Sequence, residues 1–477
     1  MLHALYNANL GLLTDLYQLT MAYGYWKSGA YKTETTFQLF FRKAPFGEDY
    51  AISAGLDTAL ELIEKFKYSP EDLAYLEGLT GNDGHSLFSK DFLTYLENMK
   101  MSVQIDAIPE GTPVLAHTPL LRVTGPIIPC QLLESALLTT INFQTLIATK
   151  AHRVCVAAGL DSVLEFGLRR AQGFDGAISA TRAAYIGGID ATSNVLAAKI
   201  LDIPVKGTHA HAWVMMFDTE EEAFETYAQA MPNNCVFLVD TYDTLEGIQN
   251  AIKVGRRLRE RGHEMLGIRL DSGDLTALSI AGRKALDDAG FPDAKIVASD
   301  SLNEHRIREL KEEGAKIDIW GVGTNLVTAQ DQPALGGVYK LSAQRQSNEQ
   351  AWIPKIKRPN SPIKVSNPGR LQVYRCYDSD EKWMVDILGS DELDLSTSIE
   401  VTELDGSQGR TLRPHRITPL LQPVFTDGLR LKASMPLSSL RVEKRSIERP
   451  SQAMPLLSAD IWKIKDRLIS QTQSISE

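Results

Sequence analysis

Two histidines follow a short apolar segment, and their position is the first chemical signal in the sequence. Residues 203–205 form a predicted buried strand, which stops at Gly207 and is followed by His209 and His211. Histidine can carry a proton or a phosphoryl group near neutral pH. In α/β enzymes, reactive side chains lie just beyond the carboxyl ends of strands. Both histidines could also be ordinary polar loop residues, so the interpretation depends on the neighbouring segments.

Polar side chains follow each of six predicted strands, which is the pattern expected of one functional face. The strands are predicted at 162–166, 203–205, 235–239, 265–270, 295–298 and 317–320. The residues that follow them are Arg169 and Arg170; Thr208, His209 and His211; Asp240, Thr241 and Asp243; Asp271, Ser272 and Asp274; Ser299, Asp300 and Ser301; and Gly321, Gly323 and Thr324. The later strands begin roughly thirty residues apart, the spacing of βα units in a parallel sheet or barrel. Asp, Ser and Thr are also common helix N-caps, but capping does not explain the arginines or His211.

These residue types suit a phosphorylated sugar with an anionic or aromatic co-substrate. The segment 321–324 offers backbone N–H groups and a hydroxyl to a phosphate. Crowded carboxylates such as Asp240 and Asp271 need a cation or hydroxyl donors, which Mg²⁺ or a ribose diol would supply. Such carboxylates would stabilise positive charge that develops at an anomeric carbon. Fixed positive charge and a ring face are offered by Arg169, Arg170, Arg269 and Phe166.

Composition places the chain among soluble globular proteins. Its 477 residues predict two or three domains. The net charge of −10 argues against a nucleic-acid partner, because no basic stripe stands out against it. Four widely spaced cysteines predict buried free thiols rather than a zinc site or a disulfide framework. With no membrane-length apolar run and no secretory leader pattern, we expect a cytoplasmic protein without membrane contact.

The predicted pattern of strands and helices changes twice and divides the chain into three segments. We expect the first and the third to form one α+β domain. The expected segments are 1–129, 130–340 and 341–477. The first contains a helix at 11–29 and a strand at 35–41 that runs into Arg42 and Lys43, where two cations could bind phosphate or simply be solvated.

The segment after residue 340 begins with a polar, proline-rich stretch. We expect a loop over 342–370, then strands, a helix near 459–468 and a disordered tail over 469–477.

Seven stretches give the chain a resemblance to a known family. They include GTHAHAW at 207–213 and GIRLDSGDL at 267–275, and the others lie at 11–22, 165–173, 187–197, 238–244 and 319–324. In this order they resemble the nicotinate phosphoribosyltransferase family, of the long bacterial and animal kind. The C-terminal part matches more loosely, mainly at 368–370 and the strand after it.

The resemblance implies an irregular, TIM-like α/β barrel and a flanking, sandwich-like α+β domain made of the N-terminal and post-barrel segments. It implies that nicotinate and phosphoribosyl pyrophosphate give nicotinate mononucleotide and pyrophosphate, in the salvage route of NAD biosynthesis. ATP hydrolysis through a transient phosphohistidine would drive the reaction, with Mg²⁺ as cofactor. A homodimer with shared active sites is also implied.

The resemblance assigns roles position by position. His211 is similar to the phosphorylated histidine, whereas His209 occupies a variable place. Asp240 and Asp271 resemble the carboxylates near ribose and Mg²⁺, and a neutral Ser193 favours nicotinate, since related nicotinamide-using enzymes have an acidic residue there. The remaining expected contacts are Phe166 and, from a partner subunit, Tyr17 on the pyridine ring; Arg169 and Arg269 on the ring carboxylate or phosphates; Thr208, Ser299 and Asp300 near the sugar; Gly321, Gly323 and Thr324 on the 5′-phosphate; and Arg42 and Lys43 on the partner's pyrophosphate.

Three other functions are compatible with parts of this pattern. The same fold could use nicotinamide or quinolinate in place of nicotinate. A barrel aldolase could use Lys206 at its strand end as a Schiff-base lysine, although a strand-end lysine is usually solvated. A regulatory paralogue could bind nucleotide without turnover, but the intact set of acidic, basic and histidine side chains argues against it.

Overall fold

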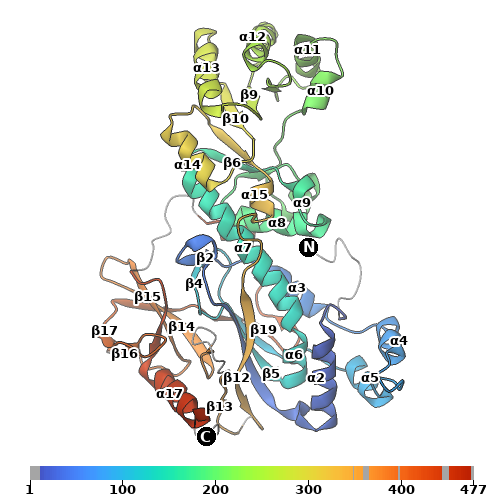
Figure 1. The fold of residues 1–477 in the computed structure, drawn as a ribbon, viewed down its shortest axis with the longest axis vertical. Coiled ribbons are helices and arrows are strands. Elements are labelled where there is room, and N and C mark those ends of the chain that lie inside the picture. The colour runs from blue at the N-terminus through green and yellow to red at the C-terminus, as the bar shows by residue number, and fades with distance from the viewer. Residues whose placement is uncertain (1–10, 348, 358–364, 396–397, 443–450, 474–477) are drawn as a thin grey trace. The chain divides into compact units, whose positions relative to one another are not determined.

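The computed structural model describes residues 11–347, 349–357, 365–395, 398–442 and 451–473 (Figure 1). Contacts divide the chain into two compact units. One contains the described residues of 1–146, 334–436 and 447–477, and the other those of 147–333 and 437–446. The protein is of the mixed α/β kind, with one parallel sheet and separate antiparallel sheets. No described helix is both long and apolar enough to cross a membrane.

The second unit is built on a parallel six-stranded sheet in the order β7-β6-β11-β10-β9-β8. Its strands are β6 (Ser162–Glu165), β7 (Ala191–Thr192), β8 (Val236–Leu238), β9 (Gly267–Leu270), β10 (Lys295–Ala298) and β11 (Ile319–Val322). Five predicted strands are confirmed, β10 with the predicted ends and the other four with shifted ends. The segment 203–205 makes only an isolated parallel bridge, from Val205 to Thr192. Strand β7, two residues long, was not predicted, because a run that short carries no periodic pattern.

Helices connect these strands (Figure 1). They are α7 (Glu134–Ala158), which begins in the first unit, η3 (Leu168–Arg170), α8 (Phe174–Ile186), α9 (Val195–Leu201), α10 (His211–Met215), α11 (Glu220–Ala230), α12 (Thr244–Glu260), α13 (Leu275–Asp288), α14 (Glu304–Glu312), α15 (Thr324–Val327) and α16 (Leu437–Leu440). Asp243 and Asp274 cap α12 and α13, accepting from backbone N–H groups at 2.9 and 3.0 Å. These two strand-end acids therefore have the capping role that their residue type favours.

Close approach of backbones fixes the sheet and its covering helix. A Cβ added at Gly267 of β9 would lie 2.1 Å from the Lys295 carbonyl oxygen of β10. One added at Gly247 of α12 would lie 2.1 Å from the Val239 carbonyl oxygen just after β8. Only glycine permits either contact, so these positions allow β10 to lie close against β9 and α12 close against the end of β8.

The first unit is antiparallel except where β21 pairs with β15. A seven-stranded sheet runs β13-β12-β1-β5-β3-β19-β20, a six-stranded sheet runs β17-β16-β21-β15-β14-β18, and β2 pairs with β4. The strands are β1 (Glu34–Phe41), β2 (Tyr50–Ile52), β3 (Gln104–Ala107), β4 (Pro113–Leu115), β5 (Leu121–Pro126), β12 (Gly337–Arg345), β13 (Ile353–Pro354), β14 (Leu371–Tyr377), β15 (Trp383–Ser390), β16 (Ile399–Thr402), β17 (Gly409–Leu412), β18 (Arg416–Pro419), β19 (Gln422–Thr426), β20 (Leu429–Arg430) and β21 (Leu456–Ser458). Its helices are α2 (Leu16–Lys27), η1 (Ala30–Lys32), η2 (Pro45–Gly47), α3 (Leu56–Glu64), α4 (Pro70–Gly78), α5 (Lys90–Glu97), α6 (Ile127–Leu132) and α17 (Ala459–Gln473).

Two expectations for the C-terminal part were wrong in part. The stretch 342–370 is not all loop, because β12 continues to Arg345 against β1 and β13 follows at Ile353–Pro354. Residues 348 and 358–364 lie outside the described residues. The tail expected from residue 469 is helical in α17 as far as Gln473. All four cysteines are buried and free, as predicted.

Candidate active site

His211 stands at the first position of α10, at the carboxyl edge of the parallel sheet. Its Nδ1 atom lies 3.1 Å from the Thr241 hydroxyl oxygen, and its Nε2 atom lies 3.7 Å from Oδ2 of Asp271. The side chain is 39% exposed, so a ligand can reach the ring. The two ring nitrogens therefore have different neighbours, and a group carried on Nε2 would face Asp271.

Arg269 on β9 links three of the loops at this edge. Its Nη1 donates to the Thr208 hydroxyl at 2.7 Å, its Nε donates to the Ser299 hydroxyl at 2.7 Å, and its Nη2 donates to Asp271 at 3.0 Å. The guanidinium is only 14% exposed, and its central carbon lies 5.9 Å from the centre of the Phe166 ring. A guanidinium held so rigidly offers positive charge in a fixed orientation to an anionic ligand.

Asp240 and Asp271 are held side by side by the backbone. The Asp271 N–H donates to Oδ2 of Asp240 at 2.8 Å, and the Ser272 hydroxyl donates to the same oxygen at 2.6 Å. Oδ1 of Asp271 accepts from Arg269 and, at 2.5 Å, from the Ser299 hydroxyl. Oδ1 of Asp240 is buried and has no hydrogen-bond partner among the described residues. One oxygen of each carboxylate thus accepts the hydrogen bonds that connect the loops, and the other oxygen accepts no strong hydrogen bond.

Phe166 follows β6, and its ring lies against Gly321 of β11. A Cβ added at Gly321 would lie 2.6 Å from the Phe166 ring, so Gly321 seats this ring. The buried Glu165 fixes the turn, because its carboxylate accepts from the Thr181 hydroxyl at 2.9 Å, from the Thr192 hydroxyl at 2.6 Å and from the Gly167 N–H. The ring is therefore fixed from both sides before any ligand binds.

The predicted phosphate segment forms the turn between β11 and α15. Gly323 is the N-cap of α15, and Thr324, its first residue, is exposed. The Asn325 side chain donates to the Ser301 and Leu302 carbonyl oxygens at 2.9 and 3.0 Å, which joins this turn to the loop after β10. Gly321 itself lies inside β11 rather than in the turn.

His209 has a different environment from His211. It is buried, its Nε2 accepts from the Leu238 N–H at 3.3 Å, and its ring packs against Phe224, Tyr227 and Phe237. Burial lowers the pKa of His209 to about 4. A neutral, enclosed imidazole of this kind holds the loop to β8 and is not available to a substrate.

Among the described residues, the other predicted ones lie at the same strand ends but outside the side-chain hydrogen-bond network, or in the other unit. Arg169 in η3 and Asp300 are exposed, and Ser193 is half-buried with its N–H donating to the Glu165 carbonyl oxygen at 2.9 Å. In the first unit, Tyr17 is 47% exposed on α2, and burial together with the Glu134 carboxylate raises its pKa to about 12. Arg42 and Lys43 follow β1 in the same unit.

Three residues near the cluster were not named as site residues from the sequence. They are Glu165, Thr241 and Ser272, which hold Phe166, His211 and Asp240 respectively. Thr241 and Ser272 stood among the polar strand-end residues, which was a signal for them. Glu165 begins the matching stretch 165–173, but nothing in the sequence indicated its role, because it lies in a strand and its partners Thr181 and Thr192 come from later segments.

Two hollows lie in this unit, and their linings differ. One of about 990 Å³ reaches from Phe166 and Thr208 at the carboxyl edge to the amino ends of the strands, where Met265, Lys295 and Ile319 line it. The other, of about 800 Å³, lies between α11 and α12 and is lined by seven carboxylates. The end of the first hollow beside Phe166 suits an aromatic ligand, whereas the second hollow would repel anions.

Comparison with known proteins identifies the family of this chain. Three family profiles match in chain order: the nicotinate phosphoribosyltransferase N-terminal domain at 12–142, the nicotinate phosphoribosyltransferase family at 162–359, and its C-terminal domain at 370–452. A nicotinate phosphoribosyltransferase of Bacillus subtilis is 49% identical over 368 residues, covering 77% of this chain and 73% of the relative. The chain belongs to the nicotinate phosphoribosyltransferase family.

Further relatives extend the similarity over most of the chain. A nicotinate phosphoribosyltransferase of Dictyostelium discoideum is 41% identical, covering 80% of this chain and 71% of the relative. The crystal structure of human nicotinic acid phosphoribosyltransferase superposes with a TM-score of 0.82 at 29% identity, covering 95% of this chain and 99% of that one. Membership of the nicotinate phosphoribosyltransferase family removes support for an aldolase, and Lys206 is exposed, without the desolvation that activates a Schiff-base lysine.

Proposed function

We propose that this protein is an ATP-dependent nicotinate phosphoribosyltransferase of NAD salvage. Nicotinate would replace the pyrophosphate of phosphoribosyl pyrophosphate at the anomeric carbon, giving nicotinate mononucleotide and pyrophosphate. The single observation that carries the proposal is the grouping of His211, Arg269 and Asp271, an accessible histidine beside a fixed guanidinium and a carboxylate. This grouping suits anionic substrates, and family membership supplies the reaction.

His211 is proposed to carry the phosphoryl group. Its Nε2 atom would attack the γ-phosphorus of ATP, the bond to the β-γ bridging oxygen would break, and ADP would leave. Thr241 occupies Nδ1, so Nε2 is the nitrogen that remains toward Asp271. Water would later remove the phosphoryl group as inorganic phosphate and restore the neutral ring.

Asp240 and Asp271 are proposed to act near the ribose and to hold Mg²⁺. The donor set fits a hard cation, because each carboxylate keeps one oxygen that makes no strong hydrogen bond. Two carboxylates do not complete an octahedral shell, so water and substrate phosphates would supply the other ligands. When bound, Mg²⁺ would neutralise the pyrophosphate leaving group. The carboxylates themselves would stabilise positive charge at the anomeric carbon.

The remaining contacts are proposed from the same assignment. Phe166 would stack on the pyridine ring of nicotinate, Arg269 with Arg169 would bind its carboxylate or the phosphates, and Ser193 would tolerate that carboxylate. Thr208, Ser299 and Asp300 would contact the sugar phosphate, and Gly321 in β11 would hold the 5′-phosphate together with Gly323 and Thr324 in the turn that follows.

We also propose the assembly that the family implies. The parallel sheet would curve as an irregular barrel spanning 130–340, flanked by a sandwich-like domain from 1–129 and 341–477. In a cytoplasmic homodimer, Tyr17 would cover the partner's pyridine site, and Arg42 and Lys43 would reach its pyrophosphate. The exposure of Tyr17 supports this, because a ring left half in solvent is free to meet a second subunit.

The test combines turnover with detection of phosphate on a histidine. Purified protein is mixed with nicotinate, phosphoribosyl pyrophosphate, Mg²⁺ and ATP, and mononucleotide is measured together with mass spectrometry of peptides containing 209–211. The expected result is phosphate on His211, lost in His211→Ala together with the coupled ATPase. ATP turnover that survives His211→Ala intact would overturn the phosphohistidine. Faster turnover of nicotinamide or quinolinate than of nicotinate would overturn the substrate assignment.

A further inference from the structure

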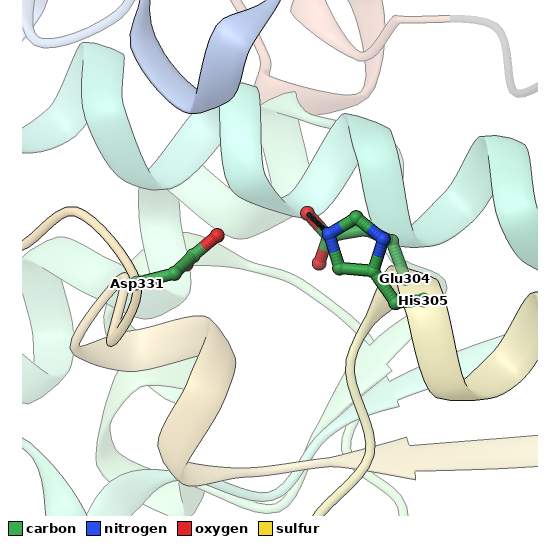
Figure 2. Close-up of side chains that lie close together, drawn as sticks. All are labelled: Glu304, His305 and Asp331. Carbon is green, nitrogen blue, oxygen red and sulfur yellow. Dashed lines mark ion pairs between the residues drawn. The ribbon is translucent and has the colours of Figure 1, made fainter.

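A group of acidic and basic side chains lies behind the strand-end loops, away from the proposed chemistry. Glu304, His305 and Asp331 each place one potential metal-ligand atom within 4.8 Å of the others (Figure 2). Figure 2 shows Glu304 and His305 on one helix and Asp331 on a separate segment. The cluster is not free to bind a cation, however, because Nζ of Lys150 lies 2.7 Å from both Glu304 and Asp331.

Lys150 is the centre of this cluster. It is 2% exposed on α7, and Arg153, on the next turn, donates its Nε to the other oxygen of Glu304 at 2.7 Å. Although burial alone would raise the pKa of Glu304, the ion pairs with Lys150 and Arg153 lower it, so the carboxylate is charged. Two cations thus match two carboxylates, and an added metal ion would be repelled.

The two carboxylates belong to two different strand-end loops. Glu304 is the first residue of α14 and directly follows the loop after β10, which carries Ser299 and Asp300. Asp331 follows α15, the helix that begins with Thr324 at the end of β11. Lys150, on α7, therefore links the segments that follow the two loops assigned to the phosphoribosyl group.

Asn325 makes a second link between the same two loops, closer to the strand ends. Its side-chain amide donates to the carbonyl oxygens of Ser301 and Leu302. Ser301 has a φ of 40°, in the left-handed region that a serine adopts only when its surroundings fix it. A strained residue between two ties indicates that the loop is held in one conformation.

Stability alone does not explain a buried ion pair at this place. Burying charges is costly, and well-packed apolar side chains often serve a fold equally well. A buried ammonium group is better suited to fixing the distance between two segments, because the carboxylates of Glu304 and Asp331 must both reach it.

We propose that Lys150 is a positioning residue for phosphoribosyl pyrophosphate, which sets the spacing between the loop 299–303 and the turn 323–325 through Glu304 and Asp331. This inference rests on the proposed function, because it takes those two loops as the phosphoribosyl site. Loss of the Lys150 ammonium group would let the two loops move apart and would weaken binding of the sugar phosphate. Binding of nicotinate beside Phe166, which Glu165 and Gly321 hold, would be spared.

The experiment measures both Michaelis constants in matched variants. Asp331→Asn removes one charge at a side chain that is 45% exposed, so the variant should still fold. Lys150→Met removes the ammonium group that both carboxylates contact. Both should raise KM for phosphoribosyl pyrophosphate about tenfold while KM for nicotinate stays within about twofold. Asp331→Glu, which keeps the charge, should restore most of the loss.

Lys311→Met is the matched control. Lys311 also ties α14 to the neighbourhood of α7, donating to the Ala158 carbonyl oxygen at 2.7 Å and to Asp161 at 2.6 Å, but at the opposite end of α14. It should lower the thermal midpoint without changing either KM. Equal changes in both constants in Asp331→Asn, or an unchanged KM for phosphoribosyl pyrophosphate, would overturn the inference. No turnover by the wild-type protein in the same assay would instead overturn the proposed function.

Discussion

The Thr241 hydroxyl lies 3.1 Å from Nδ1 of His211, so a strand-end threonine from β8 orients the ring that α10 presents. We predict that Thr241→Val lowers the rate of His211 phosphorylation by ATP about tenfold, because the ring loses the contact that directs Nε2 toward Asp271. Rapid-quench measurement of acid-labile phosphate would give this rate. Thr241→Ser, which keeps the hydroxyl, should react at close to the wild-type rate, and an equal loss in both variants would contradict the prediction.

Gly321 should be required for nicotinate binding, because its missing side chain makes room for Phe166. An added Cβ would lie 2.6 Å from that ring, so Gly321→Ala must displace it. We expect KM for nicotinate to rise about tenfold, with a smaller effect on phosphoribosyl pyrophosphate. The matched control is Gly207→Ala in the histidine loop, where an added Cβ meets nothing within 4 Å. A change confined to phosphoribosyl pyrophosphate would show that Gly321 acts only at the 5′-phosphate proposed for it and not through Phe166.

The sequence was sufficient to place the polar face, and the reason is geometric. Parallel strands end at one edge, so residues such as Asp240, Asp271 and Ser299, far apart in the chain, are brought together by the spacing of βα units alone. The sequence did not distinguish the acidic residues that cap helices from those that line the site. Asp243 and Asp271 both follow buried strands, and only the path of the next helix decides that Asp243 caps it.

The two histidines show the same limit more sharply. In the local sequence they are equivalent, two residues apart after one glycine. Their difference comes from Phe224, Tyr227 and Phe237, which enclose His209 and belong to α11 and β8. No local pattern contains that information, because it depends on tertiary packing. For the same reason residues 342–345 were predicted to be loop although they belong to β12, since the pairing of β12 with β1 joins segments about three hundred residues apart in sequence.

His209 should make the free energy of unfolding depend on pH. Burial lowers its pKa to about 4 in the folded protein, against about 6.5 when unfolded. The unfolded chain therefore binds more protons between these values, so the contribution of His209 is complete above pH 6.5 and is lost as pH falls toward 4. Between pH 7 and pH 5 the loss should be about 2 kcal/mol.

Denaturant unfolding of His209→Gln at several pH values would measure that contribution. The glutamine carbonyl can still accept from the Leu238 N–H, but it does not titrate, so the slope between pH 7 and pH 5 should fall by the same amount. His117 and His152, whose pKa values burial also lowers to about 4, should leave a residual slope. A slope equal to that of the wild-type protein would contradict the assignment of His209 as a neutral, enclosed ring.

Ser193 should contribute to the choice between nicotinate and nicotinamide. Its N–H donates to the Glu165 carbonyl oxygen at 2.9 Å, and Thr192 pairs with Glu165, so Ser193 follows β7 at the level at which Phe166 follows β6. A carboxylate introduced there by Ser193→Asp would repel the carboxylate of nicotinate but could accept a hydrogen bond from the amide of nicotinamide. We expect the ratio of kcat/KM for nicotinate to that for nicotinamide to fall about tenfold, more at low salt than at high salt because the effect is electrostatic. Ser193→Asn, of the same shape without the charge, should keep the wild-type ratio. An equal fall for both pyridines in Ser193→Asp would mean that the substitution disturbs the turn held by Glu165 rather than the recognition of charge.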